Sequence, residues 1–155
     1  CARVIRELIP NTRFYIAGFT EEEKSKKMVE HYNAIKVVDY LGFQEDIDRW
    51  LRCCHCLILP SLGGEGVPNV LLEAAATGRP CIASDVNGSV DVVEDGVNGY
   101  IFRRGDAASL IEKTEQFLSL SHEEKRQMGL RGHEKVAREF DRKIVIDKYL
   151  RELET

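Results

Sequence analysis

Short apolar runs and segments with helical periodicity alternate along most of the chain. The apolar runs predict five strands, at 13–18, 36–42, 56–61, 80–85 and 99–102. These runs are mostly apolar instead of alternating with polar residues, which is typical of parallel strands covered on both faces. The segments between them predict helices, so we expect each strand to connect to the next through a helix.

Capping signals place some of these helices. Thr20 followed by Glu23 has the spacing of a capping box and predicts a helix over 21–32. A second helix is expected over 46–54, where apolar positions recur with helical spacing.

The pattern after Gly105 is helical only, and we expect 106–155 to form C-terminal helices that pack on the sheet. Ser121 and Glu124 make another capping box. The apolar stripe of these helices contains Leu110, Ile111, Thr114, Phe117, Leu118, Val136, Phe140, Ile144, Tyr149, Leu150 and Leu153.

Uninterrupted alternation of strands and helices predicts an α/β fold with a doubly wound, Rossmann-like parallel sheet and helices on both faces. The opening residues, CARVIRELIP, have the pattern of the tail of an amphipathic helix with no strand before it. A parallel unit normally begins with a strand, so we expect the first strand to be missing. Ligands of such sheets bind beyond the carboxyl ends of strands, where Gly18, Gly42, Ser61 and Asp85 fall.

Length and composition favour a single domain over 1–155. The chain has 155 residues, of which 43% are hydrophobic, enough for one sizeable core. Its 22 basic and 26 acidic residues give a net charge of −4, which argues against a nucleic-acid partner. No apolar run approaches the ~20 residues of a membrane span, and the first residues do not resemble a signal peptide. We expect a cytoplasmic protein.

The cysteines suggest two other chemistries, zinc binding and thiol redox. Cys53 and Cys56 have Cys-x-x-Cys spacing with His55 between them, among five cysteines in all. A zinc site would need a second ligand pair, and a redox motif would open a helix, whereas this one closes a helix. We interpret these residues as small buried thiols at a helix-to-strand junction and predict no metal site.

A glycine-rich turn, GGEGVPN (63–69), leads into a helix that is expected to begin at Pro68 and end at Gly78. The first amides of a helix have no partner within it, and glycines let a ligand approach the backbone closely. A phosphate or pyrophosphate at this position gains hydrogen bonds and the favourable end of the helix dipole. The turn therefore predicts an anion site.

Two glutamates flank this predicted site. Glu65 lies in the turn, and Glu73 lies five residues after Pro68, or about 7.5 Å along a helix that rises about 1.5 Å per residue. Carboxylates repel phosphate but accept hydrogen bonds from pairs of sugar hydroxyls. A ligand with hydroxyls on both sides of a diphosphate is a nucleotide sugar. The alternative is that Glu65 shields the loop and Glu73 caps or pairs on a helix surface.

The stretch LILPSLGGEGVPNVLLEAAATGRPCIASDVNGSVDVVEDGVNGYIF resembles the C-terminal, donor-binding domain of retaining glycosyltransferases with the GT-B fold, of the family 4 or group 1 type. That family shares a Glu-x7-Glu motif, which here is Glu65 to Glu73. The segments FYIAG, YLGF and GVNGYIF fall in the family's order, so the resemblance covers nearly the whole chain.

The resemblance implies a role for each matching residue. Glu65, the catalytic candidate, would contact the donor sugar, and Glu73 would bind the ribose hydroxyls. Main-chain groups near Gly42 and Phe43 would receive the nucleobase. The turn and the strand ends would supply the rest of the donor site, namely Gly64, Gly66, Val67, Pro68, Asn69, Leu72, Ser61 and Gly18.

The resemblance also implies an activity for a longer, two-domain enzyme. It would transfer a sugar from a UDP- or GDP-linked donor to a saccharide or lipid-linked acceptor with retention of configuration, in bacterial surface polysaccharide biosynthesis. The mechanism would need neither a metal ion nor a cofactor. The acceptor would bind through an N-terminal domain absent here, with peripheral association at the inner face of the plasma membrane.

Three features depart from the family pattern. The arginine and lysine that neutralise the donor diphosphate should precede Cys1, so the chain alone is expected to be inactive. His55 stands where relatives have aspartate, and LGGEG carries an additional glycine. The alternative function is a nucleotide-sugar epimerase or a non-catalytic nucleotide-binding module. A phospho-receiver is disfavoured because Gly18 and Phe19 stand where it needs an acidic pair.

Overall fold

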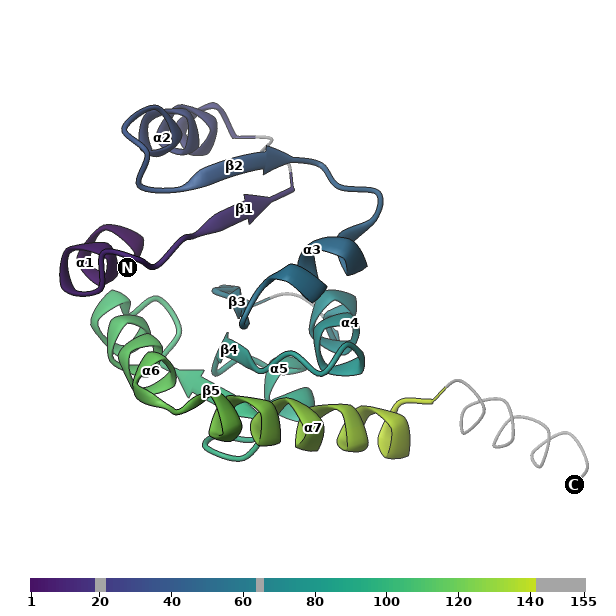
Figure 1. Ribbon diagram of the computed structural model, residues 1–155. Coiled ribbons are helices and arrows are strands. Elements are labelled where there is room, and N and C mark those ends of the chain that lie inside the picture. Colours follow the sequence, from purple (N-terminus) through teal and green to yellow (C-terminus); the bar gives the residue numbers. More distant parts are fainter. Residues whose placement is uncertain (19–21, 64–65, 142–155) are drawn as a thin grey trace, which may run out of the picture. The chain divides into compact units, whose positions relative to one another are not determined.

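The computed structural model describes residues 1–18, 22–63 and 66–141 (Figure 1). It is α/β, with parallel strands and helices against both sheet faces, as the sequence predicts. The chain divides into two compact units, Cys1–Ile47 and Asp48–Thr155. Each unit contains one parallel sheet.

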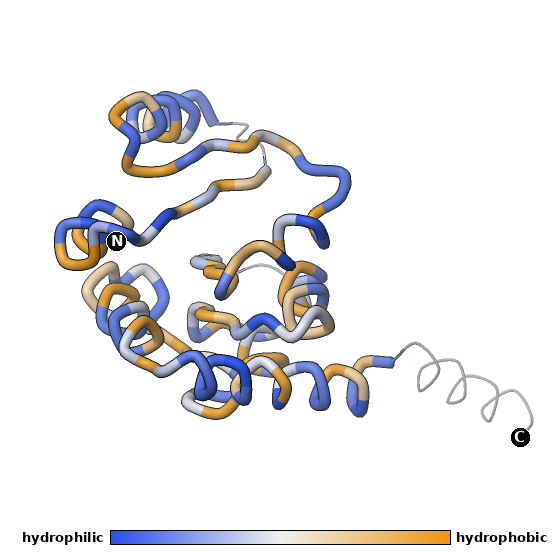
Figure 2. The backbone as a smooth tube through the Cα atoms, in the orientation of Figure 1, coloured by the Kyte–Doolittle hydropathy of each residue, from blue (hydrophilic) through white to orange (hydrophobic). Residues whose placement is uncertain are grey.

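The first unit contains four elements: α1 (Ala2–Leu8), β1 (Tyr15–Ala17), α2 (Glu23–Ala34) and β2 (Asp39–Gly42). The two strands pair in parallel, with Ile16 opposite Tyr40. Its buried hydrophobic core is small, formed by Ile5 and Val38. Helix α2 is mainly hydrophilic along its length and buries none of its residues (Figure 2).

The second unit contains a three-stranded parallel sheet in the order β3-β4-β5. Its elements are α3 (Ile47–Cys53, starting at the last residue of the first unit), β3 (Leu57–Leu59), α4 (Asn69–Ala76), β4 (Cys81–Ser84), α5 (Ser89–Val92), β5 (Gly99–Phe102), α6 (Ala107–Ser119) and α7 (His122–Glu139). All four residues of β4 are buried, as expected for the central strand.

The main core joins this sheet to the two C-terminal helices. Ile82, Phe102, Phe117 and Met128 form a buried cluster, from β4, β5, α6 and α7 respectively. Glycine at position 129 lets α7 pack closely against the segment that follows α4, because a Cβ on Gly129 would overlap the carbonyl oxygen of Gly78. Within the part of the chain that the structure describes, no helix combines the length and apolar character needed to cross a membrane.

The five predicted strands are all present, shortened by up to three residues at their ends. The predicted Ser121–Glu124 capping box is confirmed at the start of α7. Helix α2 begins at Glu23 with Glu22 as its N-cap, so the predicted start at 21 was too early; Thr20 lies outside the described residues. The predicted helical residues beyond 141 also lie outside them.

One further helix boundary and one additional helix differ from the prediction. Pro68 is the N-cap of α4 and not its first helical residue, because its ψ of 123° is extended. The short helix α5 was not predicted, since four residues after a glycine show no helical periodicity.

Candidate functional site

The predicted anion site lies at the start of α4. Pro68 caps this helix without a side-chain hydrogen bond, and the first turn contains no acidic residue. Pro68 is buried, whereas Asn69, Gly66 and Val67 are exposed. Because the first amides of a helix lack partners within it, this end of α4 presents donors and a positive dipole end to solvent. Gly64 and Glu65 lie outside the described residues.

Glu73 lies on the solvent face of α4. The opposite face buries Leu71, Ala74 and Ala75, which fixes the rotation of the helix, and Leu72 is half-buried between the two faces. Among the described residues, no hydrogen bond or ion pair involves the carboxylate of Glu73. The alternative in which Glu73 pairs on the helix surface therefore finds no support in the described residues. The carboxylate is available to a ligand.

Ser61, predicted at a strand end, lies two residues after β3, where this turn begins. Its carbonyl oxygen accepts a 2.6 Å hydrogen bond from the Ser84 hydroxyl at the end of β4. The Ser84 side chain is fully buried, so this bond ties the carboxyl ends of two neighbouring strands. Ser84 was not among the predicted site residues, although a polar residue that closes an apolar run could have indicated it.

Three other predicted residues, Gly18, Gly42 and Phe43, lie at the carboxyl end of the first unit's sheet. The Gly18 amide donates to the Gly42 carbonyl at 2.8 Å, and the Tyr40 hydroxyl donates to the Gly18 carbonyl at 2.9 Å. Both glycines have positive φ, 123° and 65°, which suits glycine in these turns. The next residue, Phe43, is 64% exposed. An exposed ring beside main-chain groups can receive a flat heterocycle.

Two of the cysteines, Cys56 and Cys81, have the environment of structural thiols. Burial raises the pKa of Cys56 to about 12 and raises the pKa of Cys81 further, with neighbouring thiols adding to both shifts. Such thiols stay protonated and unreactive near neutral pH. Cys53 is exposed, which contradicts the prediction that it is buried. Across the described residues, no cluster of His, Cys, Asp and Glu could hold a metal ion.

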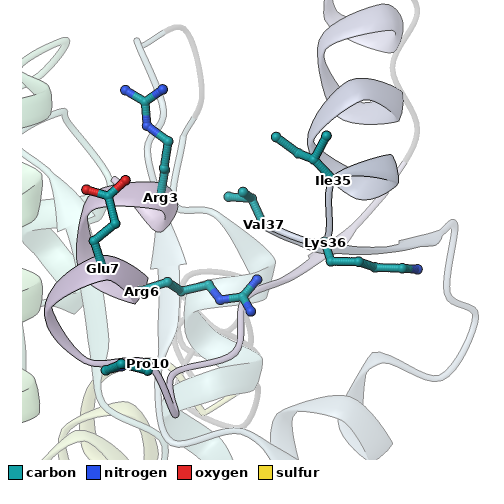
Figure 3. Close-up of a pocket in the computed structure, with 7 residues that line it drawn as sticks. All are labelled: Arg3, Arg6, Glu7, Pro10, Ile35, Lys36 and Val37. Atoms are coloured by element: carbon teal, nitrogen blue, oxygen red, sulfur yellow. The ribbon is translucent and has the colours of Figure 1, made fainter.

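A shallow pocket in the first unit contains no predicted site residue. It lies between α1 and the segment that connects α2 to β2 (Figure 3). Its lining includes three cations, Arg3, Arg6 and Lys36, with Glu7; Arg3 and Lys36 are exposed and Arg6 is half-buried. Without a buried polar group aimed into it, this lining has no specific binding feature.

Known proteins are similar to this chain over most of its length. The family described as "Glycosyl transferases group 1" matches residues 1–119. Among curated proteins, the N,N'-diacetylbacillosaminyl-diphospho-undecaprenol alpha-1,3-N-acetylgalactosaminyltransferase of Campylobacter jejuni is 31% identical over 139 residues. That match covers 89% of this chain and 36% of the relative.

Two solved structures share the fold. HepE of Anabaena, crystallised with UDP, has a TM-score of 0.86 at 20% identity, over 99% of this chain and 43% of that one. The C-terminal domain of the group 1 glycosyl transferase LpcC from Francisella tularensis has a TM-score of 0.77 at 20% identity, over 90% of this chain and 75% of that domain. The chain spans about a third of the length of the curated relatives it matches.

Proposed function

Because the chain belongs to the family of group 1 glycosyl transferases, we propose that it is the donor-binding, C-terminal half of a longer GT-B enzyme. The enzyme transfers a sugar from a UDP- or GDP-linked donor to a saccharide or lipid-linked acceptor, with retention of configuration. The observation that carries this proposal is the open start of α4, one turn before the unpaired carboxylate of Glu73.

Each part of the donor has a proposed partner. The diphosphate lies against the backbone of Gly66, Val67 and Asn69, where the amides and the dipole of α4 favour an anion. Glu73 accepts hydrogen bonds from the ribose hydroxyls, and Glu65 contacts the transferred sugar. Gly42 and Phe43 receive the base. Gly18, Ser61, Gly64, Pro68 and Leu72 complete the proposed set.

The proposed mechanism requires no metal ion. The acceptor hydroxyl oxygen attacks the anomeric carbon on the face from which the nucleoside diphosphate departs, and its proton passes to a departing phosphate oxygen. The charge that develops on the diphosphate is stabilised by amides that are already oriented, together with basic residues from outside this chain. A glutamate that contacts the far hydroxyls of the sugar is poorly placed to attack the anomeric carbon, so no covalent intermediate is proposed.

Relatives suggest the partners. The name of the Campylobacter jejuni relative specifies an undecaprenol-linked acceptor, and HepE was crystallised with UDP. We therefore propose a bacterial role in assembling a surface polysaccharide or lipid-linked oligosaccharide, with peripheral association at the cytoplasmic face of the membrane. The family match does not favour the epimerase alternative.

Donor binding to the complete protein tests the proposal. We expect calorimetry to detect UDP- or GDP-sugar binding without added metal. A hydrogen bond to a charged group contributes about 1.5–3 kcal/mol, so Glu73→Ala should weaken binding by about tenfold to a hundredfold, and Glu73→Gln by less. Glu115→Ala, another exposed helical glutamate, is the control.

Two results would contradict this assignment. Unchanged donor affinity in both Glu73 variants would remove the ribose role. Formation of epimerised donor, instead of an acceptor-linked sugar, would replace the transferase by an epimerase.

A further inference from the structure

The turn between β3 and α4 (60–68, with Gly64 and Glu65 outside the described residues) is held at both ends by other parts of the second unit. These contacts come from the last residue of β4 and from the β4–α5 and β5–α6 connections, all at the carboxyl ends of strands. They involve three residues that no sequence motif selected: Ser84, Gly88 and Arg104.

The first end of the turn is bound by two side chains. Besides the buried bond from Ser84 to the Ser61 carbonyl, the Arg104 guanidinium donates to the Leu62 carbonyl at 3.4 Å. The same nitrogen lies 3.5 Å from the position of a Cβ on Gly63. The Arg104 backbone is itself held, because its amide donates to the Asp85 carboxylate at 2.7 Å.

The second end of the turn lies directly against the backbone of Gly88. A Cβ on Gly88 would overlap the carbonyl oxygen of Gly66, and it would lie 2.6 Å from the Gly66 carbonyl carbon and 3.0 Å from the Val67 nitrogen. All three atoms are backbone, so they cannot move aside as a flexible side chain would. Any side chain at position 88 must therefore displace the segment that leads into α4.

We propose that Gly88, Ser84 and Arg104 are positioning residues that hold the two described ends of the β3–α4 turn, 60–63 and 66–68, in their donor-binding conformation. This inference rests on the proposed function of the same site. Amides contribute most to binding a diphosphate when they are already oriented before the ligand arrives, because no ordering cost then remains. Displacing Gly66 and Val67 should therefore reduce the free energy of donor binding more than it reduces the free energy of unfolding.

Gly88→Ala tests the second end, with Gly96→Ala as its matched control. Gly88 and Gly96 both have left-handed φ, 82° and 75°, so alanine is strained at either position. The two glycines differ in their surroundings: a Cβ on Gly88 would meet backbone atoms of Gly66 and Val67, whereas a Cβ on Gly96 would meet nothing within 4 Å. In the complete protein we expect Gly88→Ala to raise the dissociation constant for the UDP- or GDP-sugar by about tenfold or more, and Gly96→Ala to leave it unchanged.

Arg104→Ala tests the first end, with Arg103→Ala as control, because Arg103 is exposed and pairs with Asp106 instead of the turn. We expect a higher KM for the donor, an unchanged KM for the acceptor, and partial rescue by Arg104→Lys. Hydrogen exchange gives a readout that does not depend on donor: peptides covering 62–67 should exchange faster in Gly88→Ala than in Gly96→Ala.

Equal donor affinity and equal exchange in Gly88→Ala and Gly96→Ala would overturn the positioning role. A wild-type protein that binds neither UDP- nor GDP-sugar would instead contradict the proposed function, while the exchange comparison would still test whether Gly88 holds the turn.

Discussion

Glu73 and Glu123 are both exposed glutamates in helices, but their oxygens have different partners. Glu123 accepts hydrogen bonds from Arg126 at 2.9 Å and Gln127 at 2.7 Å, all within the first two turns of α7. The carboxylate of Glu73 has no such partner among the described residues. A carboxylate already satisfied by its own helix stabilises that helix, whereas an unsatisfied one beside an open helix start can bind hydroxyl groups.

The pH dependence of stability should reveal the role of Glu123. Hydrogen bonds from Arg126 and, to a smaller extent, from Gln127 lower the pKa of Glu123 from 4.5 to about 2. A lowered folded-state pKa means that the contribution is present above about pH 4.5 and is lost as the pH falls toward 2. We expect Glu123→Gln to be less stable than wild type at pH 7, with the difference shrinking below pH 4.5.

Urea unfolding of both proteins between pH 7 and pH 2.5 measures this difference, which should be small because the group is exposed. Glu115→Gln, at an exposed helical glutamate with no ion pair among the described residues, is the control for the loss of one carboxylate. If the difference in unfolding free energy between wild type and Glu123→Gln grew as the pH falls, the assigned hydrogen bonds would not form.

At the scale of elements, small residues determine how closely α7 packs. Its buried positions are Met128, Gly129 and Gly132, one large side chain and two glycines. Helix glycines reduce intrinsic helix stability, so their presence on a buried face indicates a need for close approach. The two glycines face different surroundings, since a Cβ on Gly129 would overlap backbone and one on Gly132 would not.

Alanine at these two positions should have opposite effects. In Gly129→Ala the new methyl meets the Gly78 carbonyl, so we expect a destabilisation of about 1–3 kcal/mol from overpacking. In Gly132→Ala the Cβ would sit 3.7 Å from Ala75 and from Asn98, an ordinary contact, so the gain in helix propensity of about 0.5–1 kcal/mol should dominate. Thermal unfolding measures both. Equal effects would mean that α7 does not pack on the end of α4 as described.

Elements that depend on local signals were predictable from the sequence, whereas elements that depend on distant contacts were not. Apolar runs located the strand centres, and the spacing after Pro68 put Glu73 on α4. Helix α5 was missed because it follows Gly88 at a φ of 82°, a backbone state that no apolar pattern encodes. The approach of Gly88 to Gly66 joins positions distant in sequence and was visible only in three dimensions.

At the scale of the whole molecule, the pairing of the strands is informative. The pairs are β1–β2, β3–β4 and β4–β5, so β1 and β3 each have one edge without a partner among the described strands. In the common doubly wound order 3-2-1-4-5-6, the first strand lies between the second and the fourth. If β1 to β5 are counted as strands 2 to 6, that order requires the three observed pairs and leaves only strand 1 unassigned.

We therefore predict that, in the complete protein, the free edge of β1 and the free edge of β3 are each paired with a strand from outside the described residues. The Leu57 amide donates at 3.0 Å to the carbonyl of Pro80, the residue before β4, and the Gly18 amide donates to the carbonyl of Gly42, the last residue of β2. Because successive amides of a strand point to opposite edges, those of Ile58 and Ala17 point toward the free edges. Residue-resolved hydrogen exchange should find Ile58 and Ala17 as protected as Leu57, since a paired amide exchanges only when the sheet opens. Exchange of Ile58 as fast as that of an exposed loop amide would show that β3 is a true sheet edge, and the assignment of β1 to β5 as strands 2 to 6 would be wrong.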